Sequence, residues 1–148
     1  MTLETPAWQA GFAFHSPEQS PGFTLWRDFM RWQRGQNARL RPFGLTQPQF
    51  AILAVCGWLT RDDQQITQHN VVETLDLDRM HVSQITTRLE RDGLINRTTC
   101  PIDLRAKQIS LTDKGKDLLR RTLPVVEGFD KAFFTSKDRP KDALNPAT

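Results

Sequence analysis

The stretch "DLDRMHVSQITTRLERDGLINRTTCPIDLRAKQISLTDKG", residues 76–115, contains the pattern that decides the fold. Its first half places Val82, Ile85 and Leu89 at i, i+3 and i+7, which is the spacing of a helix with one face toward a core. Asp78 comes directly before this helix and is a good N-cap residue. The first half therefore predicts a capped amphipathic helix.

The second half of the stretch predicts a β-hairpin. The runs "LINRTTC" (94–100) and "AKQISL" (106–111) are rich in Thr and Ile, and "PIDLR" (101–105) separates them. We expect a loop of five residues or slightly more. Ile109 and Leu111 share one face of the second strand by its period of two, so that face packs on the body of the protein.

Two further helices are predicted immediately upstream. Thr67 caps the short segment "QHNVVETL", and only "DLD" separates this segment from the helix after Asp78. So short a link predicts a positive φ, which Asp76 tolerates, and the two helices then form a helix-turn-helix. Farther upstream, Thr46 and Gln49 form a capping box at the start of a mostly buried helix, "QPQFAILAVCGWL".

Long helices are predicted at both ends of the domain. One occupies about residues 21–40, and the other begins after Thr112 and extends to about residue 135, where Pro124 is expected to kink it or divide it in two. Residues 1–20 read as a flexible arm and residues 136–148 as a polar tail. The predicted fold is mainly α with a small β-hairpin, a winged helix-turn-helix between terminal helices.

The distribution of charge indicates a surface for a polyanion. Residues 79–121 hold ten Lys and Arg against five Asp and Glu, a balance of +5, whereas the net charge of the whole chain is only +3. The predicted helix after Asp78 also carries no carboxylate on its outer face before Glu90. Carboxylates on a DNA-facing surface would repel phosphate, so this pattern favours DNA over plain solvent.

Composition argues against several other classes of protein. No run of 18 apolar residues occurs, and the start lacks a basic segment followed by an apolar one, so neither a membrane span nor a signal peptide is expected. We expect a cytoplasmic, nucleoid-associated protein whose two cysteines are reduced. Ser83, Cys100 and the histidines form no nucleophile–base pattern, so no enzyme, metal site or cofactor is expected.

The order helix-turn-helix, hairpin, long helix resembles the MarR family of bacterial transcription regulators. The segments "LTQPQFAIL", "VSQITTRLERDGLINR" and "DLRAKQISLTDKG" carry the resemblance, which covers about residues 20–134. It implies one domain over residues 21–135, with a DNA-binding lobe at about 46–112 and dimerisation helices at about 21–40 and 112–135. It also implies a homodimer on a pseudo-palindromic operator, acting as a repressor that a small aromatic or anionic effector releases.

The resemblance places Arg105 at the tip of the wing, in the minor groove, and Asp103 would hold its guanidinium and tie the N–H groups of the loop. Gln84 stands where the family often has Arg. The residues expected to contact DNA are Arg79, Met80, His81, Ser83, Gln84, Thr87, Arg88, Arg97, Asp103, Arg105 and Lys107.

The aromatic residues of the terminal segments suggest two further surfaces. The dimer interface is expected to contain Phe23, Trp26, Phe29, Phe129, Phe133 and Phe134. The effector pocket is expected to use Trp26, Met30, Phe43, Phe50 and Trp58, although each of these could equally be plain core.

Two alternative functions stay open at this point. One is a winged helix that docks another protein, which would not need an outer face free of acids. The other is a redox-sensing regulator that uses Cys100, for which Cys56 would have to come close or nearby donors would have to stabilise a thiolate.

Overall fold

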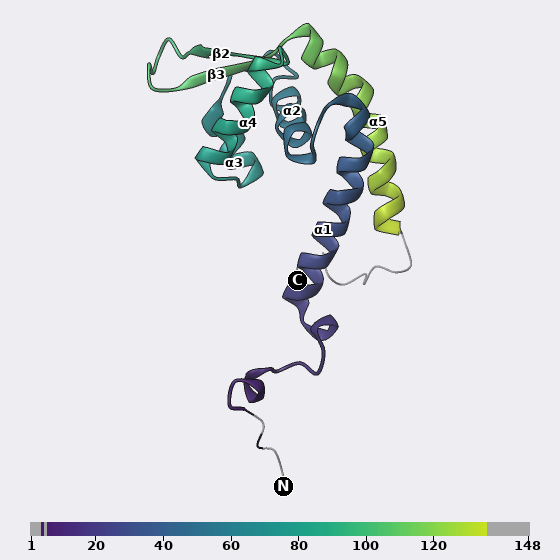
Figure 1. The fold of residues 1–148 in the computed structure, drawn as a ribbon. Helices are drawn as coiled ribbons and strands as arrows, with labels where there is room; N and C mark the ends of the chain where they lie inside the picture. Colours follow the sequence, from purple (N-terminus) through teal and green to yellow (C-terminus); the bar gives the residue numbers. More distant parts are fainter. Residues whose placement is uncertain (1–3, 5, 136–148) are drawn as a thin grey trace.

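The computed structural model describes residue 4 and residues 6–135, and two long helices lie side by side next to a smaller lobe (Figure 1). The predicted tail, residues 136–148, lies outside the described residues. The helices are α1 (Pro21–Leu40), α2 (Gln47–Leu59), α3 (Gln68–Leu75), α4 (Arg79–Arg91) and α5 (Asp113–Thr135). The strands are β1 (Ile66–Thr67), β2 (Ile95–Thr99) and β3 (Lys107–Leu111).

Single-turn 3-10 helices precede and follow α1. They are η1 (Gln9–Gly11), η2 (Pro17–Gln19) and η3 (Arg41–Phe43). The segment predicted as a flexible arm therefore has local structure, and its end is attached to α1. Glu18 accepts a hydrogen bond from the Thr24 hydroxyl through its carbonyl and pairs with Arg27 at 3.3 Å through its carboxylate.

The predicted helix starts are confirmed. The Thr46 hydroxyl accepts from the Gln49 N–H and the Gln49 side chain accepts from the Thr46 N–H, which completes the capping box of α2. Thr67 and Asn70 form the same reciprocal pair at α3. These caps satisfy N–H groups that have no partner within their own helix, so each start is fixed locally by sequence.

The short turn between α3 and α4 also has the predicted geometry. Asp76 has a φ of 53°, which reverses the chain over very few residues. Gly93 has a φ of 75° and follows Asp92, the C-cap of α4, where the chain leaves the helix for β2. Both turns bring the following element back onto the same lobe.

The hairpin belongs to a three-stranded antiparallel sheet in the order β1-β3-β2. β1 was not predicted, because two residues are too few to show an alternating pattern. It pairs Ile66 with Ile109, whereas β2 pairs Arg97 with Ile109 from the other side. The loop of the hairpin covers residues 100–106, slightly longer than the five-residue minimum expected. Its far end extends away from the helices (Figure 1).

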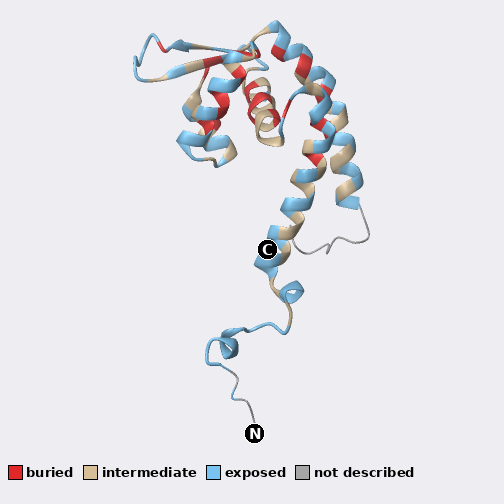
Figure 2. Cartoon of the chain, viewed as in Figure 1, coloured by how far each residue is buried: buried red, intermediate tan, exposed pale blue. Residues whose placement is uncertain are grey.

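The core lies between α2, α3, α4, α5 and the sheet (Figure 2). Val82, Ile85 and Leu89 are buried there, as the spacing predicted. Trp58 differs from the expectation of a buried position, because it is in the last turn of α2 and 63% exposed. The guanidinium of Arg61 lies 3.8 Å from its ring centroid and covers part of that apolar surface.

Helix α5 continues through Pro124. Of the two outcomes expected there, a kink or a division into two helices, the division was therefore wrong. Thr112 accepts from the Gly115 N–H and donates to the Gly93 carbonyl, so it anchors the first turn of α5 to the turn after α4. Thr122 and Val126 are buried on either side of the proline. This packing keeps the two halves in one helix despite the missing N–H.

Candidate nucleic-acid interface

The outer side of α4 is open to solvent. The Asp78 carboxylate accepts from the His81 N–H at 2.8 Å and so fixes the start of the helix. Ser83 is half-buried, and Met80 is 71% exposed. The other predicted contact residues of this helix are exposed: Arg79, His81, Gln84, Thr87 and Arg88. The structure thus brings these residues together on one face.

Thr87 is oriented by its neighbours rather than free to rotate. Its hydroxyl donates to the Ser83 carbonyl at 2.8 Å and accepts from Nη2 of Arg97 at 3.1 Å. The single hydroxyl proton is therefore used within the protein. Toward a ligand, Thr87 presents a methyl group and the remaining acceptor capacity of its oxygen.

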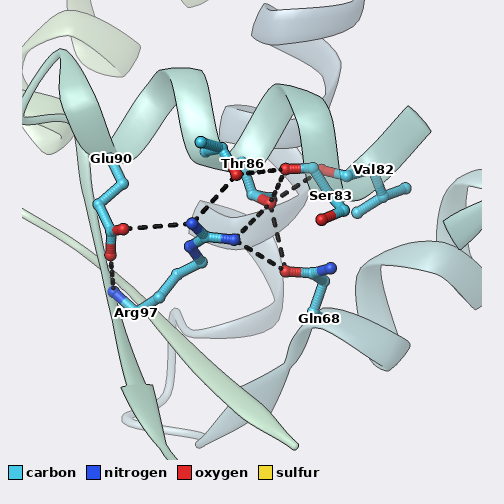
Figure 3. A network of polar contacts seen from close by, with 7 residues as sticks. Gln68, Val82, Ser83, Thr86, Glu90 and Arg97 are labelled. Carbon is cyan, nitrogen blue, oxygen red and sulfur yellow. Dashed lines mark hydrogen bonds and ion pairs between the residues drawn. The ribbon is translucent and has the colours of Figure 1, made fainter. Parts of the chain in front are cut away.

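Arg97 extends from β2 across the inner side of α4 (Figure 3). Its guanidinium donates to Thr86 and Thr87 and pairs with the Glu90 carboxylate at 3.2 Å, and its backbone N–H donates to the same carboxylate at 2.9 Å. A longer contact of 3.5 Å reaches the side-chain oxygen of Gln68 on α3. The Arg97 side chain is only 16% exposed. It is thus a brace between strand and helix, not the freely exposed phosphate contact that its charge suggested.

The same pair explains why a carboxylate is tolerated on α4. Glu90 faces Arg97 instead of the outer surface, and its charge is balanced at close range. The hydrogen bond from Arg97 lowers the pKa of Glu90 below its ordinary value. The carboxylate is therefore ionised at neutral pH and strengthens the brace.

The loop of the wing is fixed by hydrogen bonds to its own backbone. The Asp103 carboxylate accepts from the Arg105 N–H at 3.0 Å, and the Asp103 carbonyl accepts from the Ala106 N–H at 3.0 Å. The expected tie to loop N–H groups is present. The expected bond to the Arg105 guanidinium is not among the ion pairs of the described residues. Asp103 shapes the loop that carries Arg105, and the guanidinium remains exposed.

A cleft of about 650 Å³ separates this loop from the helix-turn-helix. It is bordered by Thr67, Gln68, His69, Val72, Arg79, Cys100, Ile102, Asp103, Arg105, Ala106 and Lys107. Three of these side chains are Lys or Arg, and only Asp103 is acidic. The wing, α3 and the first residue of α4 thus border a recess with a net positive charge, in agreement with the charge distribution of the sequence.

Arg88 is also engaged within the chain. Its Nε pairs with Asp92 at 3.1 Å, although more than half of the side chain stays exposed. The Asp92 carbonyl in turn accepts from Lys114 at 2.9 Å. Arg88 can reach phosphate only if it exchanges or shares this partner.

The aromatic residues predicted for a dimer interface fall into two groups. Trp26 and Phe29 on α1 are 62% and 45% exposed. Phe129 instead packs within the subunit, where its ring occupies the space beside Gly35 and lies 4.3 Å from the guanidinium of Arg39. Phe23 and Phe134 are near the exposure of Phe29, whereas Phe133 is half-buried and stacks on Phe129 at 5.8 Å. Of the six aromatics predicted for the interface, the three on α1 and Phe134 on α5 are exposed, whereas Phe129 and Phe133 pack within the chain.

The residues suggested for an effector pocket are not gathered in one chain. Phe50 is buried in the core and Phe43 packs against it, while Trp26, Met30 and Trp58 are exposed. None of the five borders the cleft beside the wing. A pocket that uses them stays a prediction.

The thiols and histidines have identifiable surroundings. Burial raises the pKa of the Cys56 thiol to about 12, so this thiol is protonated at neutral pH and poorly nucleophilic. Cys56 and Cys100 are both buried and unpaired with each other.

His69 lies 3.0 Å from Glu73 at i+4, and within the described residues no group of three His, Cys, Asp or Glu could hold a metal. In the same part of the chain, no helix is long and apolar enough to cross a membrane.

Sequence reasoning missed the polar residues on the inner side of α4. Thr86 is fully buried, and its hydroxyl donates to the Val82 carbonyl at 2.8 Å. The same hydroxyl oxygen accepts a hydrogen bond from the Arg97 guanidinium. A threonine on the apolar face of a helix, between Ile85 and Leu89, was a signal that a buried polar partner exists. The identity of that partner depends on the hairpin, which no local pattern specifies.

Comparison with known proteins connects this geometry to a described family. Residues 43–127 match the family model "ArnR1-like, winged-helix domain". The uncharacterized HTH-type transcriptional regulator YdcH of Bacillus subtilis is 34% identical over 132 residues, which are 89% of this chain and 90% of that protein.

Solved structures share the fold. The chain is similar to an Escherichia coli MarR variant in complex with operator DNA, with a TM-score of 0.68 and 21% identity over 80% of this chain and 84% of the other. It is also similar to CouR from Rhodococcus jostii bound to p-coumaroyl-CoA, with a TM-score of 0.71 and 25% identity over 89% of each chain.

Proposed function

The chain belongs to the MarR family of winged-helix transcription regulators, and we propose from this premise that it is a sequence-specific repressor, released from DNA by a small molecule. Its relatives are transcription regulators, so the chain is a regulator and not an enzyme. One observation carries the proposal. The exposed face of α4 presents cations and hydrogen-bonding groups, and Arg105 and Lys107 are exposed on the wing, while the carboxylates of Glu90 and Asp103 are engaged by Arg97 and by the loop backbone.

In the proposed complex, α4 enters the major groove and Gln84 reads a base edge. A glutamine amide can donate to and accept from adenine at once, which discriminates against the wrong base by about 1–3 kcal/mol. Gln84 is exposed in the middle of the helix face, and its side chain makes no hydrogen bond within the described residues that would restrict it. His81 and Thr87 flank it on the same face, at i−3 and i+3.

The wing supplies the second contact. Arg105 is exposed at the loop whose backbone Asp103 fixes, and Lys107 follows at the start of β3. An arginine on a short rigid loop loses less entropy on binding than one on a mobile loop. We therefore assign Arg105 to the minor groove, where a narrow A·T-rich segment concentrates negative potential.

The proposed active form is a homodimer. Trp26, Phe29 and the neighbouring Leu25, which is 50% exposed, place exposed apolar side chains on the first half of α1, and we propose that a second subunit covers them. Two α4 helices related by a two-fold axis would meet half-sites about 10 bp apart. CouR is described with p-coumaroyl-CoA bound, and we infer an effector of similar aromatic or anionic character for this chain.

The test is a titration of duplex DNA at several salt concentrations. DNA duplexes are selected from a random library by the wild-type protein, and their binding is compared with that of a scrambled duplex. We expect a pseudo-palindromic consensus and an affinity that falls about 10³-fold or more between roughly 50 and 200 mM salt. Binding that is equal for both duplexes, or independent of salt, contradicts the proposal. Sedimentation of the free protein tests the dimer separately.

A further inference from the structure

The tip of the wing carries apolar surface that the charge pattern does not explain. Ile102 is 96% exposed and Leu104 is 80% exposed, the largest values among the large hydrophobic residues of the described chain. They stand on either side of Asp103, and Leu104 directly precedes Arg105. Two aliphatic side chains therefore project beside the cation proposed for the minor groove.

These side chains are held outward by the loop itself. The Cys100 N–H donates to the Ala106 carbonyl, and Asp103 accepts from the N–H groups of Arg105 and Ala106, each at 3.0 Å. The backbone closed in this way holds residues 102 and 104 at exposed positions of the loop. Loop tips usually carry Gly, Asn, Asp, Ser or Pro, whose side chains cost nothing in water. Single exposed leucines are ordinary, but two on a braced protruding loop indicate a surface that binds.

The neighbours of the tip decide what it binds. Arg105 and Lys107 lie on the same loop and strand, and with Arg79 they border the positively charged cleft beside it. A partner must therefore offer negative charge at its rims and apolar surface within reach of the aliphatic chains. The minor groove of DNA has this combination, because phosphates line its edges and deoxyribose rings form its walls. Proteins that bind it often insert Leu, Ile or Met against a base step.

We propose that Ile102 and Leu104 enter the minor groove with Arg105, that they pack on the deoxyribose walls, and that Leu104 opens the adjacent base step. Leu104 is chosen for the base step because Ile102 borders the cleft toward α3, whereas Leu104 does not. The inference rests on the proposed function as a DNA-binding regulator. It adds a part of the affinity that does not depend on salt, and a preference for steps that unstack easily, such as TA and CA.

Salt separates the apolar contribution from the charged one. Removal of a phosphate-bound cation lowers the slope of log K against log salt by about 1, because fewer counterions are released. Removal of an apolar contact leaves that slope unchanged and weakens binding equally at every salt concentration. Arg105→Ala is therefore expected to lower the salt slope, whereas the double variant Ile102→Ser/Leu104→Ser is expected to leave it unchanged.

The experiment uses the duplex selected by the wild-type protein, with 2-aminopurine replacing adenines one at a time in the flank beneath the wing. We expect Ile102→Ser/Leu104→Ser to bind about tenfold more weakly at every salt concentration with an unchanged slope. We also expect a rise in 2-aminopurine fluorescence with the wild type that Leu104→Ser abolishes. Phe12→Ser is the matched control, since Phe12 is 73% exposed on the N-terminal segment away from the wing.

Three other results have distinct meanings. If the double variant binds as the wild type does at every salt concentration, the inference is wrong although the proposed function stands. If its DNA binding is unchanged but its sedimentation coefficient falls, the tip is a contact to a second protein copy, which also overturns the inference. If the wild type binds no duplex at all, the proposed function itself fails.

Discussion

The brace between Arg97 and Glu90 allows one prediction to be worked out in detail. Replacement of Arg97 by Met keeps most of the aliphatic stem and removes every donor of the guanidinium. The lost contacts join β2 to α4, at Glu90, Thr86 and Thr87. We expect the wing to become less firmly attached to the recognition helix.

The magnitude follows from burial. A hydrogen bond to a charged group is worth about 1.5–3 kcal/mol, but the Glu90 side chain is 39% exposed, so solvent screens part of the pair. The two threonine contacts add less than their separate values, since they share one guanidinium. We expect Arg97→Met to lower the free energy of unfolding by about 2–3 kcal/mol. Glu90→Gln should cost about 1 kcal/mol, because its amide oxygen can still accept from the Arg97 N–H.

Urea unfolding of the two single variants and the double variant measures this coupling. We expect an interaction free energy of about 1 kcal/mol or more, with an unchanged m-value. Arg91→Met is the control, since Arg91 is exposed on the same helix and its loss should change stability by less than about 0.5 kcal/mol. On selected DNA, Arg97→Met should weaken binding without a change in the salt slope. If the slope of log K against log salt falls by about 1 and the stability is unchanged, Arg97 is not a brace and contacts phosphate instead.

The pH dependence of the brace has a defined sign. Because Arg97 lowers the pKa of Glu90 in the folded state, the stabilisation is fully present above the ordinary pKa of 4.5 and is lost as the pH falls through the lowered value. The stability difference between the wild type and Glu90→Gln should therefore shrink on acidification below about pH 4.5. A difference that grows at acid pH would contradict the assignment.

Three further outcomes are expected. Gln84→Ala should flatten the preference among duplex variants at one base pair, by about 1–3 kcal/mol, and an equal loss on scrambled DNA would exclude base reading. Asp103→Ala should weaken binding to the selected duplex whereas Asp103→Asn retains most of it, because the amide oxygen replaces the acceptor for the loop N–H; equal binding by both variants would rule out the turn. Gly115→Ala should lower the free energy of unfolding by about 1–3 kcal/mol, because a Cβ there meets the Leu94 carbonyl. Gly128→Ala has no atom near the added Cβ and should raise the free energy of unfolding by up to about 1 kcal/mol. Thermal unfolding of the two variants distinguishes these effects.

Features that depend on neighbouring residues in the chain could be predicted from sequence. The capping pair of Thr46 and Gln49, the cap at Asp78 and the positive φ of Asp76 each involve residues within one helical turn. The amphipathic spacing of apolar residues in α4 likewise predicted which side of the helix is buried. These local signals were sufficient for the winged helix-turn-helix order, and the structure confirms it.

Features that depend on distant residues were not predictable in the same way. β1 is recognisable only through its pairing with β3, because Ile66 and Thr67 contain no pattern of their own. Arg97 appears in the sequence as one more cation in a basic region, and its partner Glu90 becomes meaningful only when β2 is laid against α4. The same limit applies to Phe129, an aromatic near the end of a helix that turned out to fill the space beside Gly35.

Carboxylates near the proposed DNA-binding face need a physical explanation. Coulomb repulsion alone says that any acid near a phosphate weakens binding, so a DNA-binding surface should lack them. Here Asp78 caps α4, Asp92 pairs with Arg88, Glu90 holds Arg97 and Asp103 closes the loop of the wing. Asp78 fixes the start of α4, Glu90 holds the brace between β2 and α4, and Asp103 shapes the loop that carries Arg105, whereas Asp92 holds Arg88 in a pair that phosphate would have to replace. Removal of Asp78, Glu90 or Asp103 relieves a repulsion that solvent screens, but it also frees a group whose fixed geometry lowers the entropy cost of binding. We therefore expect neutral replacements that keep the hydrogen-bond acceptor to be tolerated, and replacements that remove it to weaken binding despite the gain in positive charge.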